Sequence, residues 1–407
     1  MRRAALCAVL TVAFVPSSAG AQSLTLTEAD VLARLSKESP RARAIRSAVE
    51  IARVDVLAAA RLPNPHPSIT RESVAGVTEY LTTVSQVLPI TGRRGFDIEA
   101  ASALMSATSS RADDELRRLR ADLRLAFADL VTAQSREREL TGGLARLREL
   151  ADVLARREQE GDAAGFDRLR AEREVLDVES DLVVVATDRA RAQATLTTFF
   201  AETVNPSQIV AVSSPAASAP VPPLEALLER AETARGELIA LQREVDAAGF
   251  AARAADRRRL PEPELLAGTK SSSVGAGDVG SVVTVRAAIP LFDRARPERA
   301  LAAARAAQAE ARAASFRVVL RGEVAALREA VVQRRVAAER YRAEAINSAA
   351  QIERIAQVAY DAGERGILEL LDAYRIGASA RIRQAALDSA VRQAEIELAF
   401  ASGWEMP

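Results

Sequence analysis

Residues 362–375 read "AGERGILELLDAYR", and a related stretch, "EGDAAGFDRLRA", occupies residues 160–171. In both, a glycine is followed by acidic, apolar and charged residues in a similar order and then by alanine. Gly161 and Gly363 are separated by 202 residues. A recurrence at so long and so regular a spacing indicates an internal duplication.

Other short stretches recur with nearly the same spacing. "LPNPH" at 62–66 is matched by "LPEPE" at 260–264, which lies 198 residues later, and Pro89 is matched by Pro290, 201 residues later. Each half reads as a helix, a β-hairpin, a long helix, a hinge and a second long helix. The sequence therefore predicts a mainly α fold with a small β part, built as a duplicated coiled coil with two inserted hairpins.

The N-terminus has the pattern of a secretory signal. Arg2 and Arg3 precede an uncharged apolar run and a small-residue stretch that ends at Ala21. We expect cleavage after residue 21. The only cysteine, Cys7, lies inside this segment, so the mature chain is expected to have no disulfide and no lipid-anchored N-terminal Cys.

Composition shifts give the expected boundaries. A Pro/Ser/Ala-rich linker separates two repeats, and each repeat holds one hairpin followed by long helices. The expected segments are 1–21 (signal), 22–204 (first repeat, hairpin about 66–90, helices about 92–200), 205–223 (linker) and 224–407 (second repeat, hairpin about 262–291, helices about 297–402).

Apolar residues in the proline-free stretches keep a 3-4 spacing over several heptads, which predicts long helices with a coiled-coil seam. A helix from Arg93 to about Glu160 spans on the order of 100 Å. The two expected seams are Leu116, Leu119, Leu123, Ala126, Leu130, Ala133, Leu140, Leu144, Leu147, Ala151 and Leu154, and Val324, Leu327, Val331, Ala338, Tyr341, Ala345, Ile352, Ile355 and Ala359.

Overall composition agrees with long, solvated helices. Apolar residues make up 49% of the chain but aromatic residues only 4%, and 55 basic residues balance 55 acidic ones. The charges of both signs are interspersed, which is typical of solvated helix faces. We read no nucleic-acid binding from this pattern.

The expected strands are about ten residues long, which matches a tilted bilayer crossing. Two strands alone are marginal in water, so the strands of several chains could pool into one closed barrel. Odd positions from Val279 to Ile289 are suited to face lipid, whereas Thr284 and Arg286 would face a wet lumen. The other three strands alternate poorly, and Tyr80 is the only aromatic residue in the four.

Over nearly its whole mature length the chain resembles a TolC-type outer-membrane efflux factor. The duplicated plan, "LPNP", "VSQVLPITGRRG" and the two hinge stretches carry this resemblance. It implies a homotrimer in the outer membrane with a twelve-stranded transmembrane β-barrel, four strands from each protomer, continued by an α-helical tunnel through the periplasm. The stretch "VLPITGRRG" is similar to the metal-exporting branch of the family.

The resemblance also implies partners and a passive function. The barrel would lie in outer-membrane lipid, and the tunnel would dock on a periplasmic adaptor protein and an inner-membrane pump of the resistance-nodulation-division type. Such a channel performs no chemistry and needs no cofactor. The alternative is a soluble periplasmic coiled-coil scaffold or adaptor without a pore. The exported substrate, the cognate pump and the resting state of the gate stay open.

Glu369 and Asp372 lie three residues apart after the second hinge, so they share a helix face. Acids at the matching family positions ring the periplasmic aperture of the pore, where threefold symmetry would gather six carboxylates. The simpler alternative is a pair of solvated acids. Glu369 stands where the founding member of the family has Asp.

Asp167, Tyr360 and Arg365 match the positions at which the family latches its tunnel shut with hydrogen bonds and ion pairs. Charge-assisted bonds between arginine and carboxylate suit such a latch, and an ordinary surface pair is the alternative. Gly161 and Gly363 are expected to end the long helices and reverse the chain. The resemblance adds that these hinges border the grooves where adaptors dock.

We find no catalytic, cofactor or metal site in the sequence. His66 is the only histidine, and a metal site needs several ligands. Nothing has the spacing of a nucleophile and base pair, a phosphate loop or a cofactor fingerprint.

Overall fold

The computed structural model describes residues 23–35, 39–160, 165–213, 219–274 and 278–404. The expected order of helix, hairpin and long helices is found twice. The first half contains α1 (Glu28–Arg34), α2 (Pro40–Ala59), β2 (His66–Val74), β3 (Val77–Val87), α3 (Arg93–Glu160) and α4 (Gly165–Thr197). The second contains α5 (Leu224–Ala234), α6 (Gly236–Arg257), β5 (Pro263–Ser272), β6 (Val279–Ala287), α7 (Arg296–Tyr341), the π-helical η2 (Arg342–Ile346), α8 (Asn347–Asp361) and α9 (Ile367–Ser402).

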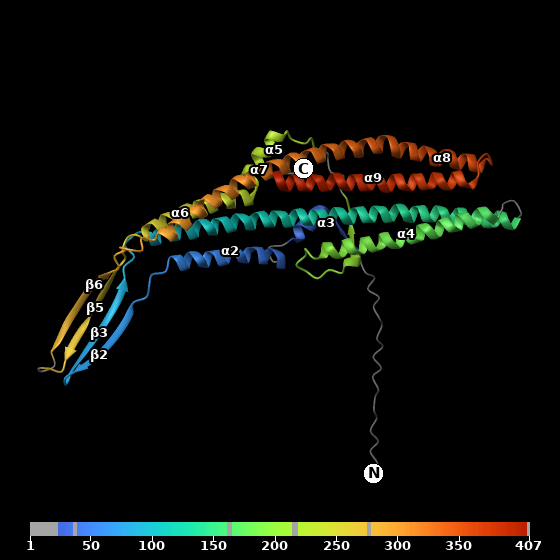
Figure 1. Ribbon diagram of the computed structural model, residues 1–407. Coiled ribbons are helices and arrows are strands. Elements are labelled where there is room, and N and C mark those ends of the chain that lie inside the picture. The colour runs from blue at the N-terminus through green and yellow to red at the C-terminus, as the bar shows by residue number, and fades with distance from the viewer. Residues whose placement is uncertain (1–22, 36–38, 161–164, 214–218, 275–277, 405–407) are drawn as a thin grey trace, which may run out of the picture.

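The molecule is elongated, with its strands at one end and its helical turns at the other (Figure 1). The 68 residues of α3 span about 100 Å at 1.5 Å per residue. The four strands gather at one end of α3, whereas α3 and α4, like α8 and α9, meet near its far end (Figure 1). The expected signal segment and Gly161 lie outside the described residues.

The predicted seam of α3 is buried over most of its length. Leu123 and Leu130 are fully buried, and Leu116 and Ala151 are partly covered. Helix α3 packs against both α6 and α4, so one helix of the first half is shared with the second half. The buried seam residues are Leu119, Leu123, Ala126, Leu130, Ala133, Leu140, Leu144, Leu147 and Leu154.

The predicted seam of the second half is correct only at its start. Val324, Val331 and Ala338 are buried, but Ile352 and Ile355 are exposed. Between these two groups lies the π-helical turn η2. A π turn adds one residue to the helical repeat and so rotates every later side chain around the axis. The prediction that Ile352 and Ile355 are buried was therefore wrong.

Residues 205–223, expected to be a linker, include the short helix η1 (Pro206–Gln208) and the strand β4 (Ile209–Ala211). Strand β4 pairs in parallel with β1 (Leu24–Leu26). Leu26 and Ile209 are both buried in a cluster with residues of α1 and α3. The start of the described chain is thus fastened beside the connection between the halves.

The four long strands form one antiparallel sheet in the order β2-β3-β5-β6. The two hairpins meet through β3 and β5, where Val84 lies opposite Ala267. The first hairpin turns through Ala75 and Gly76, which both have positive φ, and this is the geometry that a two-residue hairpin turn demands. Strands β2 and β6 remain as the open edges of the sheet.

Candidate functional site: the helical tip and the strand sheet

The turn between α8 and α9 is built around Gly363. Its φ of 73° is in the left-handed region, which glycine adopts without steric cost. The amide of Gly363 donates to the carbonyl oxygen of Tyr360 at 3.0 Å, and the amide of Glu364 donates to that of Ala359 at 2.9 Å. These two bonds form the Schellman motif that ends a helix. The structure thus gives Gly363 the chain-reversing role that the sequence predicts.

Apolar side chains hold the two helical hairpins together at this tip. Leu150 and Leu154 of α3 pack in one cluster with Ile367, Leu370 and Leu371 of α9. Leu370 is fully buried, and burial of a leucine side chain contributes about 1.5–3 kcal/mol. The cluster fixes the face that α9 turns toward α3. The remaining faces of α9 are left for polar residues.

Glu369 and Asp372 lie on the exposed part of α9, immediately after the turn. Their neighbours Leu370 and Leu371 are buried, so the helix itself turns the two carboxylates outward. Arg365 lies 3.9 Å from Glu369, between Nη1 and Oε1. Both of these side chains are largely exposed, and an ion pair of this kind contributes little to stability.

The three residues predicted to form a latch do not contact one another within one protomer. Among the described residues, the ion pair of Arg365 is made with Glu369, and the ring of Tyr360 lies 5.7 Å from the guanidinium of Arg157. Asp167 lies in the first turn of α4, where the helix dipole favours a negative charge. Any bond among the three would have to form between protomers.

An ion pair that was not predicted from the sequence joins the two hinge regions. The guanidinium of Arg375 in α9 donates from Nε to Oε1 of Glu174 in α4 at 2.6 Å, and also from Nη2 to Oε2. Only 7% of Glu174 is exposed. The hydrogen bonds that Arg375 donates to Glu174 raise the pKa of Arg375. The bidentate geometry makes this a strong form of the interaction.

A usable signal for this pair was present in the sequence. Glu174 and Arg375 are 201 residues apart, which is the offset of the internal repeat. They therefore occupy nearly equivalent places in the two halves and carry opposite charges.

A second, partly buried network lies further along the same helices. Arg381 of α9 donates from Nε to Glu139 of α3 at 2.8 Å and from Nη2 to Glu353 of α8 at 3.0 Å. One arginine thus connects three helices behind the tip. The tip is held by an apolar cluster and by two arginine-centred links.

At the other end of the molecule, the register of the sheet sorts its side chains into two faces. Residues that lie directly opposite each other on neighbouring strands share a face of the sheet. Glu72 lies opposite Glu79, and Glu264 lies opposite Arg286. Lys270 lies 2.7 Å from Glu79, between Nζ and Oε2. Charged side chains from all four strands therefore share one face, and these are Glu72, Glu79, Glu264, Lys270 and Arg286.

The opposite face is nearly free of charge. Among the described strand residues, only Arg71 is charged on this face, and its guanidinium lies 5.9 Å from the ring of Tyr80. The aliphatic side chains here are exposed, and 72% of Val283 is accessible. They include Ile69, Val84, Leu265, Val279, Val283 and Val285. Such a sheet suits a wall between an apolar medium and water.

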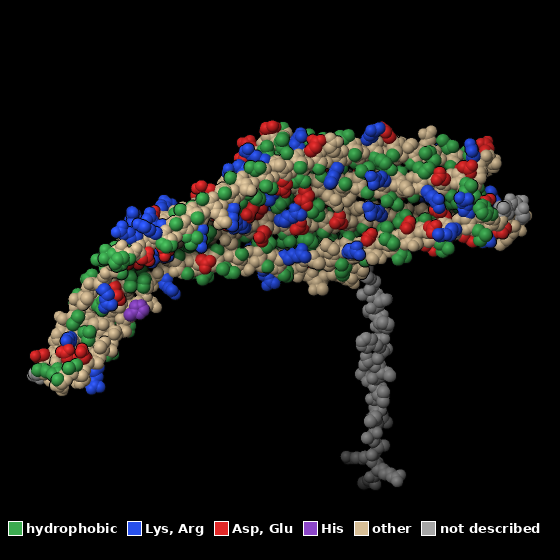
Figure 2. Space-filling model, in the orientation of Figure 1, with side chains coloured by type: hydrophobic (Ala, Val, Ile, Leu, Met, Phe, Trp, Pro, Cys, Tyr) green, Lys and Arg blue, Asp and Glu red, His purple; other side chains and the backbone are tan. Residues whose placement is uncertain are grey.

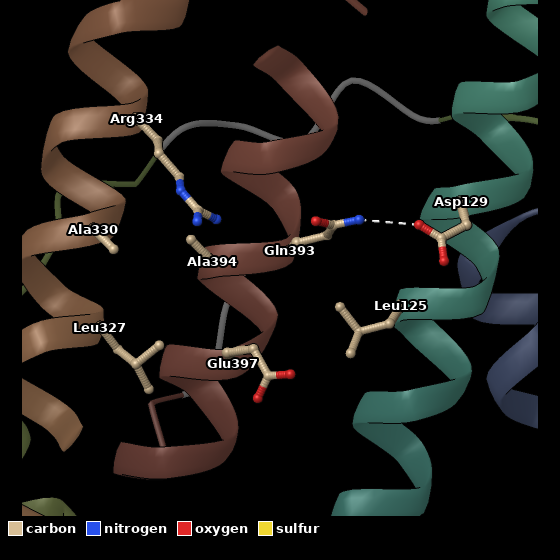
Figure 3. Close-up of a pocket in the computed structure, with 8 residues that line it drawn as sticks. All are labelled: Leu125, Asp129, Leu327, Ala330, Arg334, Gln393, Ala394 and Glu397. Carbon is tan, nitrogen blue, oxygen red and sulfur yellow. Dashed lines mark hydrogen bonds between the residues drawn. The ribbon is translucent and has the colours of Figure 1, made fainter. Parts of the chain in front are cut away.

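A hollow of about 330 Å³ lies where α3, α7 and α9 run side by side (Figure 3). Gln393 donates from Nε2 to Oδ1 of Asp129 at 3.0 Å across α9 and α3. The other polar groups also serve helix packing, because Arg334 donates to the carbonyl oxygen of Ala390 and Glu397 accepts from Arg118. The hollow is a seam between helices whose polar side chains are engaged with each other and with the backbone.

Two features are absent from the described residues. No helix in this part of the chain combines the length and apolar character that crossing a membrane requires. No group of three or more His, Cys, Asp or Glu side chains is placed to hold a metal ion within the described ranges.

Comparison with solved structures gives one consistent fold. The chain is similar to the outer membrane protein VceC from Vibrio cholerae, with a TM-score of 0.77, 16% identity and coverage of 93% of this chain and 97% of that one. It is similar to the Campylobacter jejuni CmeC outer membrane channel, with a TM-score of 0.79, 14% identity and coverage of 92% of this chain and 85% of that one. It is also similar to the open state of the Neisseria gonorrhoeae MtrE outer membrane channel, with a TM-score of 0.74, 18% identity and coverage of 92% of this chain and 89% of that one. No curated protein matches the chain.

A protein-family model matches part of the sequence. The model for the outer membrane efflux protein matches residues 227–404, which span α5 to α9 and include the tip and the second hairpin. The structural matches extend over both halves of the chain. Residues 227–404 therefore match the model of the outer membrane efflux protein family, and the chain as a whole has the fold of these outer-membrane channels.

Proposed function

We propose that the protein is the outer-membrane channel of a tripartite efflux pump, a passive trimeric conduit from the periplasm to the exterior that is gated at its helical tip. One observation carries this proposal. A four-stranded sheet with one charged face, one nearly uncharged face and two open edges lies at the end of a helix about 100 Å long. Transport through a pore needs no reacting group, and the family is one of transport channels.

The open edges explain why several chains are needed. Exposed strand edges must pair with something, and in a membrane a sheet must close on itself. Four strands are too few to surround a channel, whereas three copies supply twelve. In that ring, β2 of one protomer pairs with β6 of the next. The charged face lines the lumen and the aliphatic face meets lipid.

We assign the two repeats to residues 22–204 and 224–407, each contributing one hairpin to the barrel and one pair of helices to the tunnel. The tunnel spans the periplasm and docks on an adaptor protein and an inner-membrane pump. Gly161 and Gly363 mark the turns at which the adaptor docks. The exposure of the tip residues after Gly363 supports this placement.

The gate lies at the tip. Threefold symmetry brings three copies of Glu369 and Asp372 around one axis, and the exposure of both carboxylates supports this ring. Arg365, Tyr360 and Asp167 form their latch contacts between protomers. The link between Glu174 and Arg375 holds α9 against α4 in each protomer.

The acidic ring is tested by conductance. In planar bilayers, we expect Glu369→Gln with Asp372→Asn to lower the preference for cations over anions, because six carboxylates leave the aperture. Glu329→Gln with Glu339→Gln, two exposed acids of α7, is the matched control and leaves the preference unchanged. Equal selectivity of the two variants would show that the two acids do not line the aperture.

The proposed function is tested by separating the membranes of expressing cells on a density gradient and measuring the native mass of the extracted protein. A trimer in the outer-membrane fraction is expected. A soluble monomer or dimer would contradict the proposal and favour a periplasmic coiled-coil scaffold without a pore.

A further inference from the structure

A basic and apolar surface lies where the helices meet the sheet. We call it the junction patch, and Figure 2 shows blue side chains gathered beside green ones at this level. Its arginines and its apolar residues are all exposed. The basic members are Arg257, Arg258, Arg259, Arg294 and Arg296, and the apolar members are Ile90, Leu260, Ile289, Leu291 and Phe292.

The positive charge of the junction patch is not neutralised by the chain. Among the described residues, none of its five arginines has an ion pair. Two nearby acids are already paired, because Asp256 lies 2.5 Å from Arg299 and Glu262 lies 3.5 Å from Arg93. Asp293 accepts from the amide of Ala295 at 2.9 Å and keeps its charge, so one unpaired acid of the described chain stands against the five arginines. The patch therefore presents a local excess of positive charge to its surroundings.

Helix capping explains only part of this charge. Arg257 is in the last turn of α6, where a cation is favoured by the helix dipole. Arg294 and Arg296 flank the start of α7, where the dipole disfavours a cation. An external anion would offset that cost.

The basic and apolar residues share the walls of one hollow. Its volume is about 700 Å³, and its lining includes Arg257 and Arg258 together with Ile289, Leu291 and Phe292. Arg93, Glu262 and Asp293 also line it, and Glu262 is paired with Arg93. Phe292 is completely exposed in one chain. A large aromatic side chain gains free energy by leaving water, and girdles of aromatic residues lie at both interfaces of outer-membrane barrels. The hollow can thus accept a molecule with an anionic and an apolar part.

Its place in the fold identifies the occupant. Residues 289–292 follow directly after the end of β6 at Ala287, on the side of the sheet where the helices begin (Figure 1). If the strands cross the bilayer, the junction patch lies at the headgroups of the leaflet nearest the helices. We propose that the patch binds an anionic phospholipid of that leaflet. Its phosphate contacts Arg257 and Arg258, and its first methylene groups contact Leu291 and Phe292.

This inference rests on the proposed function, because it requires the sheet to lie in a membrane. Beyond that function, it assigns to the junction patch, at the base of the barrel, a preference for anionic over neutral phospholipids. Each arginine near an anionic surface contributes about 1 kcal/mol, which corresponds to roughly fivefold in affinity. Two arginines therefore give a preference on the order of 20-fold.

The test uses the assembled protein extracted from membranes, stripped of lipid and mixed with equal amounts of phosphatidylglycerol and phosphatidylcholine. Native mass spectrometry measures which lipid each trimer retains. The variants are Arg257→Gln with Arg258→Gln, and the charge-matched control is Arg312→Gln with Arg354→Gln, two exposed arginines on α7 and α8. A salt titration of the unmodified protein provides a measurement that does not depend on a variant.

We expect the unmodified trimer to retain more phosphatidylglycerol than phosphatidylcholine, and this preference should fall as salt is added. In the Arg257/Arg258 variant the ratio of the two retained lipids should fall on the order of 20-fold. The control variant should keep the ratio of the unmodified protein. Three results would overturn the inference: equal retention of both lipids, equal behaviour of variant and control, or complete displacement by inorganic phosphate, which would indicate a free-anion site. An adaptor protein that binds the patch with no lipid preference would also overturn it. Failure to form membrane-inserted trimers would contradict the proposed function instead.

Discussion

At the scale of single residues, the tip depends on one backbone conformation. Gly363 is left-handed, and a Cβ atom placed on it would meet nothing within 4 Å. The cost of a substitution there is therefore conformational and not a clash. That cost is about 1–2 kcal/mol for an L-residue in this region.

We predict that Gly363→Ala accelerates hydrogen exchange of the amides around the α8–α9 turn by roughly fivefold or more, because opening this turn becomes about 1 kcal/mol easier. Gly143→Ala is the matched control, since Gly143 is inside α3 and its Cβ also has open space. Alanine should slow exchange slightly there, because it is the better helix former. Identical exchange at the tip of both variants would show that the turn does not require glycine.

Glu28 links the N-terminal segment to both halves of the protein. Its carboxylate accepts from Arg124 at 2.5 Å and from Arg392 at 2.6 Å. Burial alone would raise the pKa of Glu28, but the hydrogen bonds and charges of the two arginines outweigh burial and lower it. The lowered pKa means that this carboxylate stabilises the folded state above its unfolded pKa of about 4.3.

The stabilisation should be lost as pH falls from about 5 through the lowered pKa of the folded protein. We predict a steeper drop of the melting temperature in this range for the unmodified protein than for Glu28→Gln, measured by circular dichroism. Glu50→Gln, which removes an exposed pair with Arg53, serves as the control and should keep the full drop. If the melting temperature fell equally steeply with pH in all three proteins, Glu28 would not contribute to the acid sensitivity of the fold.

At the scale of elements, proline-free seams and the internal repeat were sufficient to predict the long helices and both hairpins. The two faces of β6 could be predicted from its alternation, but the faces of the whole sheet could not, because alternation along one strand does not say which residue of the next strand lies beside it. Only the register joins Glu79 to Lys270 and Val84 to Ala267. The exposure of Ile352 was missed for a similar reason, since a π turn leaves no clear mark in hydrophobic spacing.

The site was predicted unevenly. Local backbone rules were enough for Gly363, because a glycine that follows a helix is a strong signal by itself. The pair of Glu174 and Arg375 needs two helices that are distant in sequence to be adjacent. The proposed latch and acidic ring depend on contacts between protomers, which one chain does not contain.

The link between α4 and α9 gives a prediction at this scale. Glu174→Gln should weaken it by about 1–2 kcal/mol, because a charge-assisted bond is lost but Arg375 can still reach water. Hydrogen exchange in the first turns of α9 should rise on the order of tenfold. Glu172→Gln, which removes a bond to Arg168 within α4, should have no such effect on α9. Exchange restored by Glu174→Arg with Arg375→Glu would confirm a direct pair, and equal exchange in the Glu174 and Glu172 variants would refute it.

The two faces of β6 give a second prediction. Val283→Lys places a charge on the aliphatic face, and a charge facing lipid near the middle of a bilayer costs about 2–4 kcal/mol. We expect at least a tenfold smaller fraction of membrane-inserted protein. Thr284→Lys places the same charge one residue later on the charged face and should insert normally. Equal insertion of the two variants would mean that neither face of the sheet meets lipid.

At the scale of the whole molecule, the helices are stabilised within one chain, whereas the sheet is left with open edges. The helices carry buried seams and arginine links along about 100 Å, whereas the sheet has two faces of different polarity and two unpaired edges. The edges have no partner within one described chain. Assembly is therefore the step that completes the protein.

The most direct test of this account is cross-linking between β2 and β6. Cys7 is the only cysteine of the sequence and lies in the expected signal segment, so one cysteine placed along β2 and one along β6 give a specific probe. Oxidation in intact membranes should produce covalent dimers and trimers, at positions that alternate with the side-chain period of a strand. Only monomers at every pair of positions, or dimers that never extend to trimers, would contradict a barrel closed by three chains.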